Sequence, residues 1–211
     1  MLAVRDLSFA YRRGGEELFG GLSHEFREGA MTAVTGPSGR GKSTLLYVLG
    51  LMLTPTRGQV LVDGVPVSTH PDRRRSAVRA SRIGFVFQDS ALDASRTILD
   101  SVVEPAMYAG WRRRRARERA MALLTRMGVD RRADHRPGEI SGGQAQRVAV
   151  CRALVTDPRV VLADEPTGNL DRVNAAEVLD ALSAAAGRHR TVVIATHDPY
   201  VLERADEVLA L

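Results

Sequence analysis

The chain has 211 residues, of which 44% are hydrophobic and 26% charged, as in an ordinary globular protein of one or two domains. Its formal net charge of +5 is compatible with nucleic acid or an anionic membrane surface as a partner, although arginine enrichment also follows from a high-GC genome. Cys151 is the only cysteine, which excludes an internal disulfide and fits a reducing compartment.

Neither the start of the chain nor its apolar stretches predict a membrane-spanning protein. Residues 1–6 lack the apolar core of a signal peptide. The longest apolar stretch, residues 45–53, is interrupted by Tyr47 and Gly50. It is also shorter than the roughly 20 residues that a membrane helix requires. We therefore expect a chain that does not cross a membrane by itself.

The amino-terminal part of the chain predicts short strands separated by glycine turns. Apolar and polar residues alternate through residues 1–30, with turn signals at 13–15 and 28–29, as in antiparallel strands. An Asp63-Gly64 turn predicts a hairpin. This hairpin covers residues 59–67, and further strands are expected at residues 31–35 and 83–88.

The pattern changes after residue 88. Apolar residues recur at helical spacing from about residue 89 to residue 139, which predicts a helical insert. A helix, a strand at 160–163, a second helix at 173–185 and a strand at 191–195 then follow in order. This order predicts an α/β domain with a mainly parallel sheet, an antiparallel β subdomain and an inserted α-helical subdomain. The expected division is a core of residues 1–88 and 141–211 and a helical subdomain of residues 89–140.

A phosphate-binding loop follows the strand at 31–35. The run Gly36-Pro37-Ser38-Gly39-Arg40-Gly41-Lys42-Ser43 fits G-x-x-x-x-G-K-[ST] without a mismatch, and residues 44–49 suit the first turns of a helix. Lys42 is the only lysine among 30 basic residues, which indicates that a compact ammonium is needed there. Glycines and a helix N-terminus direct N–H groups at an anion, and Ser43 can place a hydroxyl on Mg²⁺. A chance glycine turn is the alternative, which the strand and helix context disfavours.

Two adjacent carboxylates end the strand at 160–163. Asp164 suits the magnesium side of a nucleotide site, acting mostly through water, because Mg²⁺ keeps several of its waters. Glu165 then faces the γ-phosphate, where a base can orient and polarise an attacking water. The alternative is a strand end with solvated acids.

A second helix start is also suited to phosphate. Ser141 and Gln144 form a capping box before an apolar helical run, which by itself predicts only a well-capped helix. Gly142 and Gly143 strip side chains from that helix start and leave bare N–H groups for an anion.

Together with Gln88, residues 168–171 and His197, these motifs occur in the order and approximate spacing of the ATP-binding cassette (ABC) ATPases, which the chain resembles over essentially its whole length. The resemblance implies ATP and Mg²⁺ as ligands and a homodimer that sandwiches the nucleotide. The resemblance implies that the nucleotide and its metal are held by three groups of residues: Gly36–Ser43 and Thr44 hold the phosphates, Ser43, Gln88 and Asp164 serve the metal, and Tyr11 stacks on adenine. For hydrolysis it implies that Glu165 is the catalytic base, that Gln88 also meets the attacking water and that His197 contacts the γ-phosphate. At the dimer interface it implies that Asp171 crosses to the partner and that the partner subunit's nucleotide is covered by Ser141, Gly142, Gly143 and Gln144. For Tyr11 a core role is the alternative, since Phe9 and Phe19 are near.

The run at residues 165–171, with 55–58 and 108–110, is similar to ATPases of the lipoprotein-release, macrolide-export and antimicrobial-peptide-export group. That resemblance implies a peripheral protein at the cytoplasmic face of the membrane, which drives a separate permease and exports its cargo. The similar cell-division ATPase, and signalling without cargo transport, remain alternatives. A nucleic-acid ATPase is disfavoured because long coiled-coil arms are absent from the sequence, and a GTPase because no Asn-Lys-x-Asp motif is present.

Several positions depart from the family pattern. Arg40 stands where small residues are frequent, residues 89–94 are more acidic than usual, and Cys151 replaces a common alanine, as a buried small residue. The chain stops at Leu211, where relatives usually add a final turn and strand, so the sheet edge there is expected to be less stable.

The arginines at 112–115, 117 and 119 predict a solvated helix face, with anionic lipid as a second interpretation and nucleic acid as a third.

Overall fold

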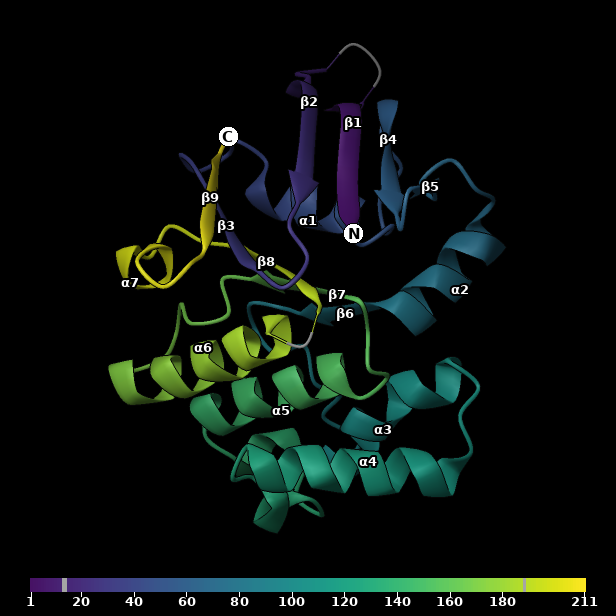
Figure 1. The fold of residues 1–211 in the computed structure, drawn as a ribbon. Helices are drawn as coiled ribbons and strands as arrows, with labels where there is room; N and C mark the ends of the chain where they lie inside the picture. Colours follow the sequence, from purple (N-terminus) through teal and green to yellow (C-terminus); the bar gives the residue numbers. More distant parts are fainter. Residues whose placement is uncertain (13–14, 188) are drawn as a thin grey trace.

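The computed structural model describes residues 1–12, 15–187 and 189–211, and contains two sheets with helices between and below them (Figure 1). One sheet is antiparallel, in the order β2-β1-β4-β5. Its strands are β1 (Leu2–Phe9), β2 (Leu18–Phe26), β4 (Arg57–Val62) and β5 (Val65–Pro66). The other sheet is parallel, in the order β6-β7-β8-β3-β9. Its strands are β3 (Met31–Thr35), β6 (Ile83–Val86), β7 (Val160–Asp164), β8 (Thr191–Ala195) and β9 (Glu207–Ala210).

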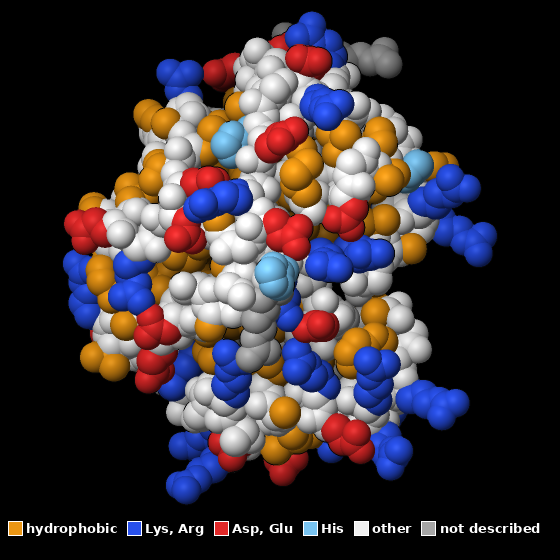
Figure 2. Space-filling model, viewed as in Figure 1, with side chains coloured by type: hydrophobic (Ala, Val, Ile, Leu, Met, Phe, Trp, Pro, Cys, Tyr) orange, Lys and Arg blue, Asp and Glu red, His pale blue; other side chains and the backbone are white. Residues whose placement is uncertain are grey.

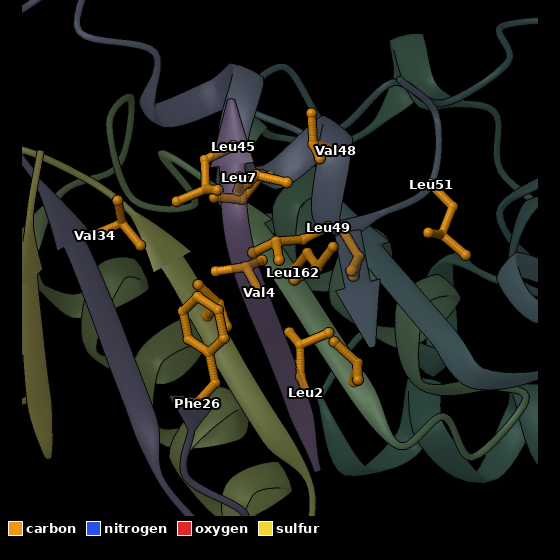
Figure 3. Packing of buried hydrophobic residues seen from close by; sticks show 14 of the residues in the cluster. Leu2, Val4, Leu7, Phe26, Val34, Leu45, Val48, Leu49, Leu51 and Leu162 are labelled. Atoms are coloured by element: carbon orange, nitrogen blue, oxygen red, sulfur yellow. The ribbon is translucent and has the colours of Figure 1, made fainter. Parts of the chain in front are cut away.

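Helix α1 lies between the two sheets. Its buried leucines pack with Leu2, Val4 and Leu7 of β1 on one side and with Leu162 of β7 on the other (Figure 3). The next residue back along β7, Val161, points to the opposite face of the parallel sheet, because side chains alternate along a strand. Helices α5 and α6 cover that second face, and α3 and α4 pack in turn on α5. The helices are α1 (Lys42–Leu49), α2 (Asp72–Arg82), α3 (Ile98–Tyr108), α4 (Arg113–Arg126), α5 (Gly142–Leu154), α6 (Arg172–Ala186) and α7 (Pro199–Leu202), with short 3₁₀ turns η1 (Asp130–Arg132) and η2 (Pro137–Glu139).

Most of the predicted elements are present. Strands β3 and β8 have the predicted bounds, and helices fill much of the predicted insert. The hairpin between β4 and β5 turns at Asp63 and Gly64, with φ of 52° and 77°, as a type I′ turn requires. Cys151 is fully buried, and burial raises the pKa of its thiol to about 12. Of the predicted turn at 13–15, residues 13 and 14 lie outside the described residues.

Helix α2, strand β9 and the short helix α7 were not predicted from the sequence. Helix α2 contains no buried residue, so it has no apolar stripe to reveal it in the sequence. Strand β9 pairs in parallel with β3 at the edge of the sheet, although only alternate residues of β9 are partly buried. Within the described residues, no helix is long and apolar enough to cross a bilayer.

Gly84 of β6 lies where this strand approaches α5 closely, so a substitution there tests the packing of the two elements. A Cβ at this position would fall far inside van der Waals contact with the backbone oxygen of Ala153. Because a backbone atom cannot move without shifting α5, we expect Gly84→Ala to lower the free energy of unfolding by about 3 kcal/mol, measured by chemical denaturation. The matched control is Gly138→Ala, where a Cβ would meet no described atom within 4 Å. Equal stability of the two variants would contradict the packing of β6 on α5.

Candidate functional site

The predicted site segments follow the carboxyl ends of neighbouring parallel strands. The phosphate-binding loop follows β3, Asp164 ends β7, His197 comes two residues after β8, and Gln88 comes two residues after β6. Carboxyl ends of parallel strands meet at one edge of a sheet, which is where open α/β sheets bind ligands. Segments far apart in the chain are therefore gathered at this edge.

The loop between β3 and α1 adopts a glycine-dependent path. Gly36, Gly39 and Gly41 have φ of 148°, 83° and 91°, in a region that residues with a Cβ rarely occupy. At Gly36 a Cβ would also lie only 2.7 Å from a backbone oxygen of Leu211. Lys42 Nζ donates hydrogen bonds to the carbonyl oxygens of Gly36 (2.8 Å) and Pro37 (3.3 Å), so its ammonium is held over the loop. Arg40 is exposed.

Ser43 and Asp164 join the loop to β7. The Ser43 hydroxyl donates to Asp164 Oδ1 at 2.9 Å, although the two residues are 121 positions apart in the chain. Asp164 is 4% exposed, and this burial raises the pKa of its carboxyl, an effect that the Ser43 hydrogen bond partly offsets. Tyr47 lies one helical turn after Ser43, and burial together with the charge of Asp164 raises the pKa of its phenol. Tyr47 was not predicted from the sequence, although its spacing of four from Ser43 places both residues on one helix face.

Glu165 is held by two partners that follow β8. Its carboxylate accepts a hydrogen bond from the Thr196 hydroxyl at 3.0 Å and lies 2.6 Å from His197 Nδ1. Its backbone has φ of 42°, which is uncommon for a residue with a side chain and costs free energy. The backbone N–H of Glu165 donates to the carbonyl of Ala195 at 2.9 Å. The structure thus turns the chain sharply after Asp164 and fixes the second carboxylate beside His197, whose side chain is 78% exposed.

Gln88 lines a small cavity of about 140 Å³. Gly142, Pro166 and Asn169 line the same cavity, so the segment after β6 lies near both the start of α5 and the segment after Glu165. Gln88 itself is exposed.

The start of α5 is capped as predicted. The backbone N–H of Gln144 donates to Ser141 Oγ at 3.3 Å, and the backbone N–H of Ser141 donates to Gln144 Oε1 at 3.0 Å. Gly142 would place a Cβ in open space, whereas a Cβ on Gly143 would lie 2.5 Å from Asn174 Oδ1. Among the described residues, no hydrogen bond or ion pair joins residues 141–144 to the loop at 36–43 of the same chain.

Asp171 caps helix α6. Its carboxylate accepts from the backbone N–H of Asn174 at 2.9 Å and from the Asn174 side-chain amide at 2.6 Å. The backbone hydrogen bond is the largest cause of the lowered pKa of Asp171. Asn174 therefore connects the cap of α6 with Gly143 of α5, a contact that the sequence analysis did not anticipate.

Tyr11 lies beside the start of α1. Its hydroxyl is 2.7 Å from the hydroxyl of Thr44, and its ring and that of Phe9 pack at nearly right angles with centroids 4.9 Å apart. The residue is 68% exposed, which rules out the alternative core role. Stacking of Tyr11 on adenine stays a prediction.

A larger groove of about 570 Å³ opens between α2, β6 and α3. Phe85 and Phe87 contribute to its wall, and they continue an aromatic row from Tyr47, with ring centroids 5.7 Å and then 4.4 Å apart. Arg152 also lines the groove and donates to the carbonyls of Ser90 (2.8 Å) and Ala91 (2.6 Å). Packed aromatic rings thus connect the groove to Tyr47, which lies beside Asp164.

Comparison with known proteins identifies the family of the chain. The ABC transporter family profile matches residues 19–168. The lipoprotein-releasing system ATP-binding protein LolD of Paramagnetospirillum magneticum is 43% identical over 213 residues, which cover 100% of this chain and 94% of LolD. The dimeric, post-hydrolysis structure of the ATP-binding cassette MJ0796 bound to ADP and Pi matches with a TM-score of 0.91 and 32% identity, covering 100% of this chain and 94% of that one.

A third match is the structure of cbiO1 from Clostridium perfringens, part of the ABC transporter complex cbiONQ, with a TM-score of 0.86 and 30% identity over 99% of this chain and 83% of that one. A P-loop cassette with paired carboxylates and a capped glycine helix start defines a nucleotide-hydrolysing class of protein. Within this class, the chain belongs to the ABC transporter family. It is accordingly an ATPase, the ATP-binding subunit of a transporter.

Proposed function

We propose that two copies of this chain hydrolyse ATP at their shared interface and so drive a separate membrane permease of the lipoprotein-release and macrolide-export branch. The observation that carries the proposal is the convergence of Ser43–Asp164 and Glu165–His197 beside the phosphate-binding loop. Asp164 would serve the metal side, Glu165 would polarise the attacking water, and His197 would contact the γ-phosphate.

The donor set suits Mg²⁺ as the ion that accompanies ATP. The buried carboxylate of Asp164 and the Ser43 hydroxyl, which donates to it at 2.9 Å, offer hard oxygen ligands, which this ion prefers. Ser43 and Gln88 would hold it directly and Asp164 mostly through water. When bound, Mg²⁺ neutralises charge on the β- and γ-phosphates.

A symmetric dimer would complete each site. Gly142 leaves the start of α5 bare, while residues 141–144 make no hydrogen bond to their own phosphate-binding loop among the described residues. In an isologous pair, Ser141 to Gln144 of one copy would cover the γ-phosphate bound by the other, with Asp171 at the interface. The dimeric state of the MJ0796 cassette supports this arrangement.

The groove between α2, β6 and α3 is the proposed docking site of the permease. It lies between the core (residues 1–88 and 141–211) and the proposed helical subdomain (residues 89–140), and aromatic rings connect it to Tyr47 beside Asp164. Docking there would place the ATPase at the cytoplasmic face of the membrane as a peripheral subunit. The similarity to LolD favours lipoprotein release as the process that the ATPase drives.

Reconstitution separates this function from its alternative, in which ATP-driven pairing signals through a membrane partner without moving cargo, as in cell division. The chain would be incorporated into vesicles with the permease encoded beside it, and ATP turnover and cargo movement would be measured together. We expect both to occur and to stop together when Glu165 is replaced by Gln. Turnover that the permease stimulates without any cargo movement would favour the signalling alternative.

A further inference from the structure

Arginines from two separate helices project from one side of the molecule. Arg73 and Arg74 lie in the first turn of α2, and Arg112–Arg115 lie at the start of α4; all of them are exposed. Figure 1 places the starts of both helices on the right-hand side, and Figure 2 shows Lys and Arg side chains projecting from that side at both heights. We call these six residues the arginine rim.

The fold gains little from the charges of the rim. Among the described residues, Arg73, Arg74 and Arg112 make no ion pair. The pairs from Arg113 to Asp100 (3.5 Å) and from Arg114 to Glu118 (3.8 Å) involve arginines that are 67% and 91% exposed, and Arg115 stacks over the ring of Trp111 at 3.9 Å. The first turn of α4 holds no acidic residue, so its arginines stand at the positive end of the helix dipole, where a cation is unfavourable. Four consecutive like charges also repel one another. An anion outside the chain would relieve both costs.

The rim flanks the groove of the proposed permease site. Ser76, Ala77 and Ala80 of α2 line one side of the groove, a few residues after Arg73 and Arg74. Pro105 and Tyr108 of α3 line the other side, and α4 begins five residues after Tyr108. The charges therefore stand on both sides of the groove rather than within it.

Large apolar side chains accompany the arginines at the groove. Tyr108 is 73% exposed, Met107 41% and Met52 41%, and both Tyr108 and Met52 line the groove. Exposed tyrosine and apolar side chains beside arginines are typical of surfaces that lie at the headgroup level of a bilayer. The planar guanidinium also matches the geometry of a phosphate, which it can bind with two hydrogen bonds.

We propose that the arginine rim binds anionic phospholipid headgroups while the permease occupies the groove between its two halves. The inference rests on the proposed docking of the permease in that groove. The rim would add electrostatic attraction to the membrane and orient the groove toward the bilayer, because its charges lie on both sides of the opening.

Vesicle binding tests the rim directly. The intact chain would be sedimented with phosphatidylcholine vesicles, with and without phosphatidylglycerol, and compared with the triple variant Arg73→Gln, Arg74→Gln, Arg112→Gln. The control is Arg5→Gln, Arg126→Gln, Arg131→Gln, which removes the same charge from exposed positions on β1, the far end of α4 and η1. We expect wild type and control to bind only the anionic vesicles. The rim variant should bind them about 100-fold more weakly, since each arginine near an anionic surface contributes roughly a factor of five.

Three further measurements on the same variants separate the possible outcomes. The melting temperature of the rim variant should not fall, because Arg112→Gln removes an unfavourable charge from the start of α4. Its ATP turnover without membranes, and its complex with the permease in detergent, should equal those of wild type.

The proposal would be overturned if the wild-type chain does not bind anionic vesicles, or if the rim variant binds them as well as the control does. A rim variant that loses only the permease complex would also overturn it, since the arginines would then contact protein. If wild type binds anionic vesicles but forms no complex with the permease, the proposed docking fails while the lipid surface stands.

Discussion

Replacing Lys42 by alanine is expected to reduce ATP turnover at least about 100-fold, the loss found when one donor to a developing phosphate charge is removed. The Lys42 ammonium donates to the carbonyls of Gly36 and Pro37, so it is already held where the β- and γ-phosphates would lie. Once it is lost, the loop retains only neutral N–H donors and the helix dipole for a triphosphate. Steady-state phosphate release and nucleotide binding by the purified chain measure the effect.

Two variants in the same loop make this result specific. Arg40→Ala removes another cation that is exposed, and we expect its turnover to stay within about tenfold of wild type, as for a charge in solvent that is worth little. Lys42→Arg keeps the charge but replaces a compact ammonium by a wide planar fork, and should not restore turnover. The melting temperature should change by only a few degrees in each, because Arg40 is exposed and Lys42, the first residue of α1, is only partly buried. Normal nucleotide affinity and turnover in Lys42→Ala would refute the triphosphate site.

The parts of the site that the sequence predicted are those encoded within a few consecutive residues. A strand, a glycine turn and a helix start adjoin along the chain, so local pattern suffices to place Lys42 and Ser43. The capping box of Ser141 and Gln144 is likewise formed within four residues and appears as expected. The mainly parallel sheet was predicted from the alternation of strands and helices, whereas the pairing of β3 with β8 within it was not.

The parts that the sequence did not predict depend on contacts between distant residues. Asn174 fills the space left by Gly143, and nothing near either residue in the chain indicates the other. The left-handed backbone of Glu165 is equally hidden, because a strained conformation persists only where surrounding structure enforces it. Helix α2 buries no side chain, so hydrophobic periodicity could not reveal it.

Replacing Glu165 by glutamine is expected to leave ATP binding intact while lowering turnover by about 10²- to 10⁴-fold, the usual contribution of a general base. Glutamine retains an oxygen that can accept from the Thr196 hydroxyl, so the local structure should persist. It cannot take a proton from water, and hydrolysis should stop with the triphosphate bound. Two copies clamped around uncleaved ATP should then remain together, because the phosphates neutralise a helix N-terminus of each copy.

Size-exclusion chromatography with ATP and Mg²⁺ measures this pairing. We expect Glu165→Gln to elute as a dimer with ATP and as a monomer with ADP, whereas wild type returns to monomer once its ATP is spent. The double variant Lys42→Ala, Glu165→Gln is the matched control and should stay monomeric, since it cannot hold the triphosphate. A second control, Gly142→Asp, places a carboxylate at an open position on the start of α5, where it should repel the partner's γ-phosphate and abolish pairing. A Glu165→Gln chain that stays monomeric with ATP would refute the shared site. A Gly142→Asp, Glu165→Gln chain that still pairs would place the interface away from α5.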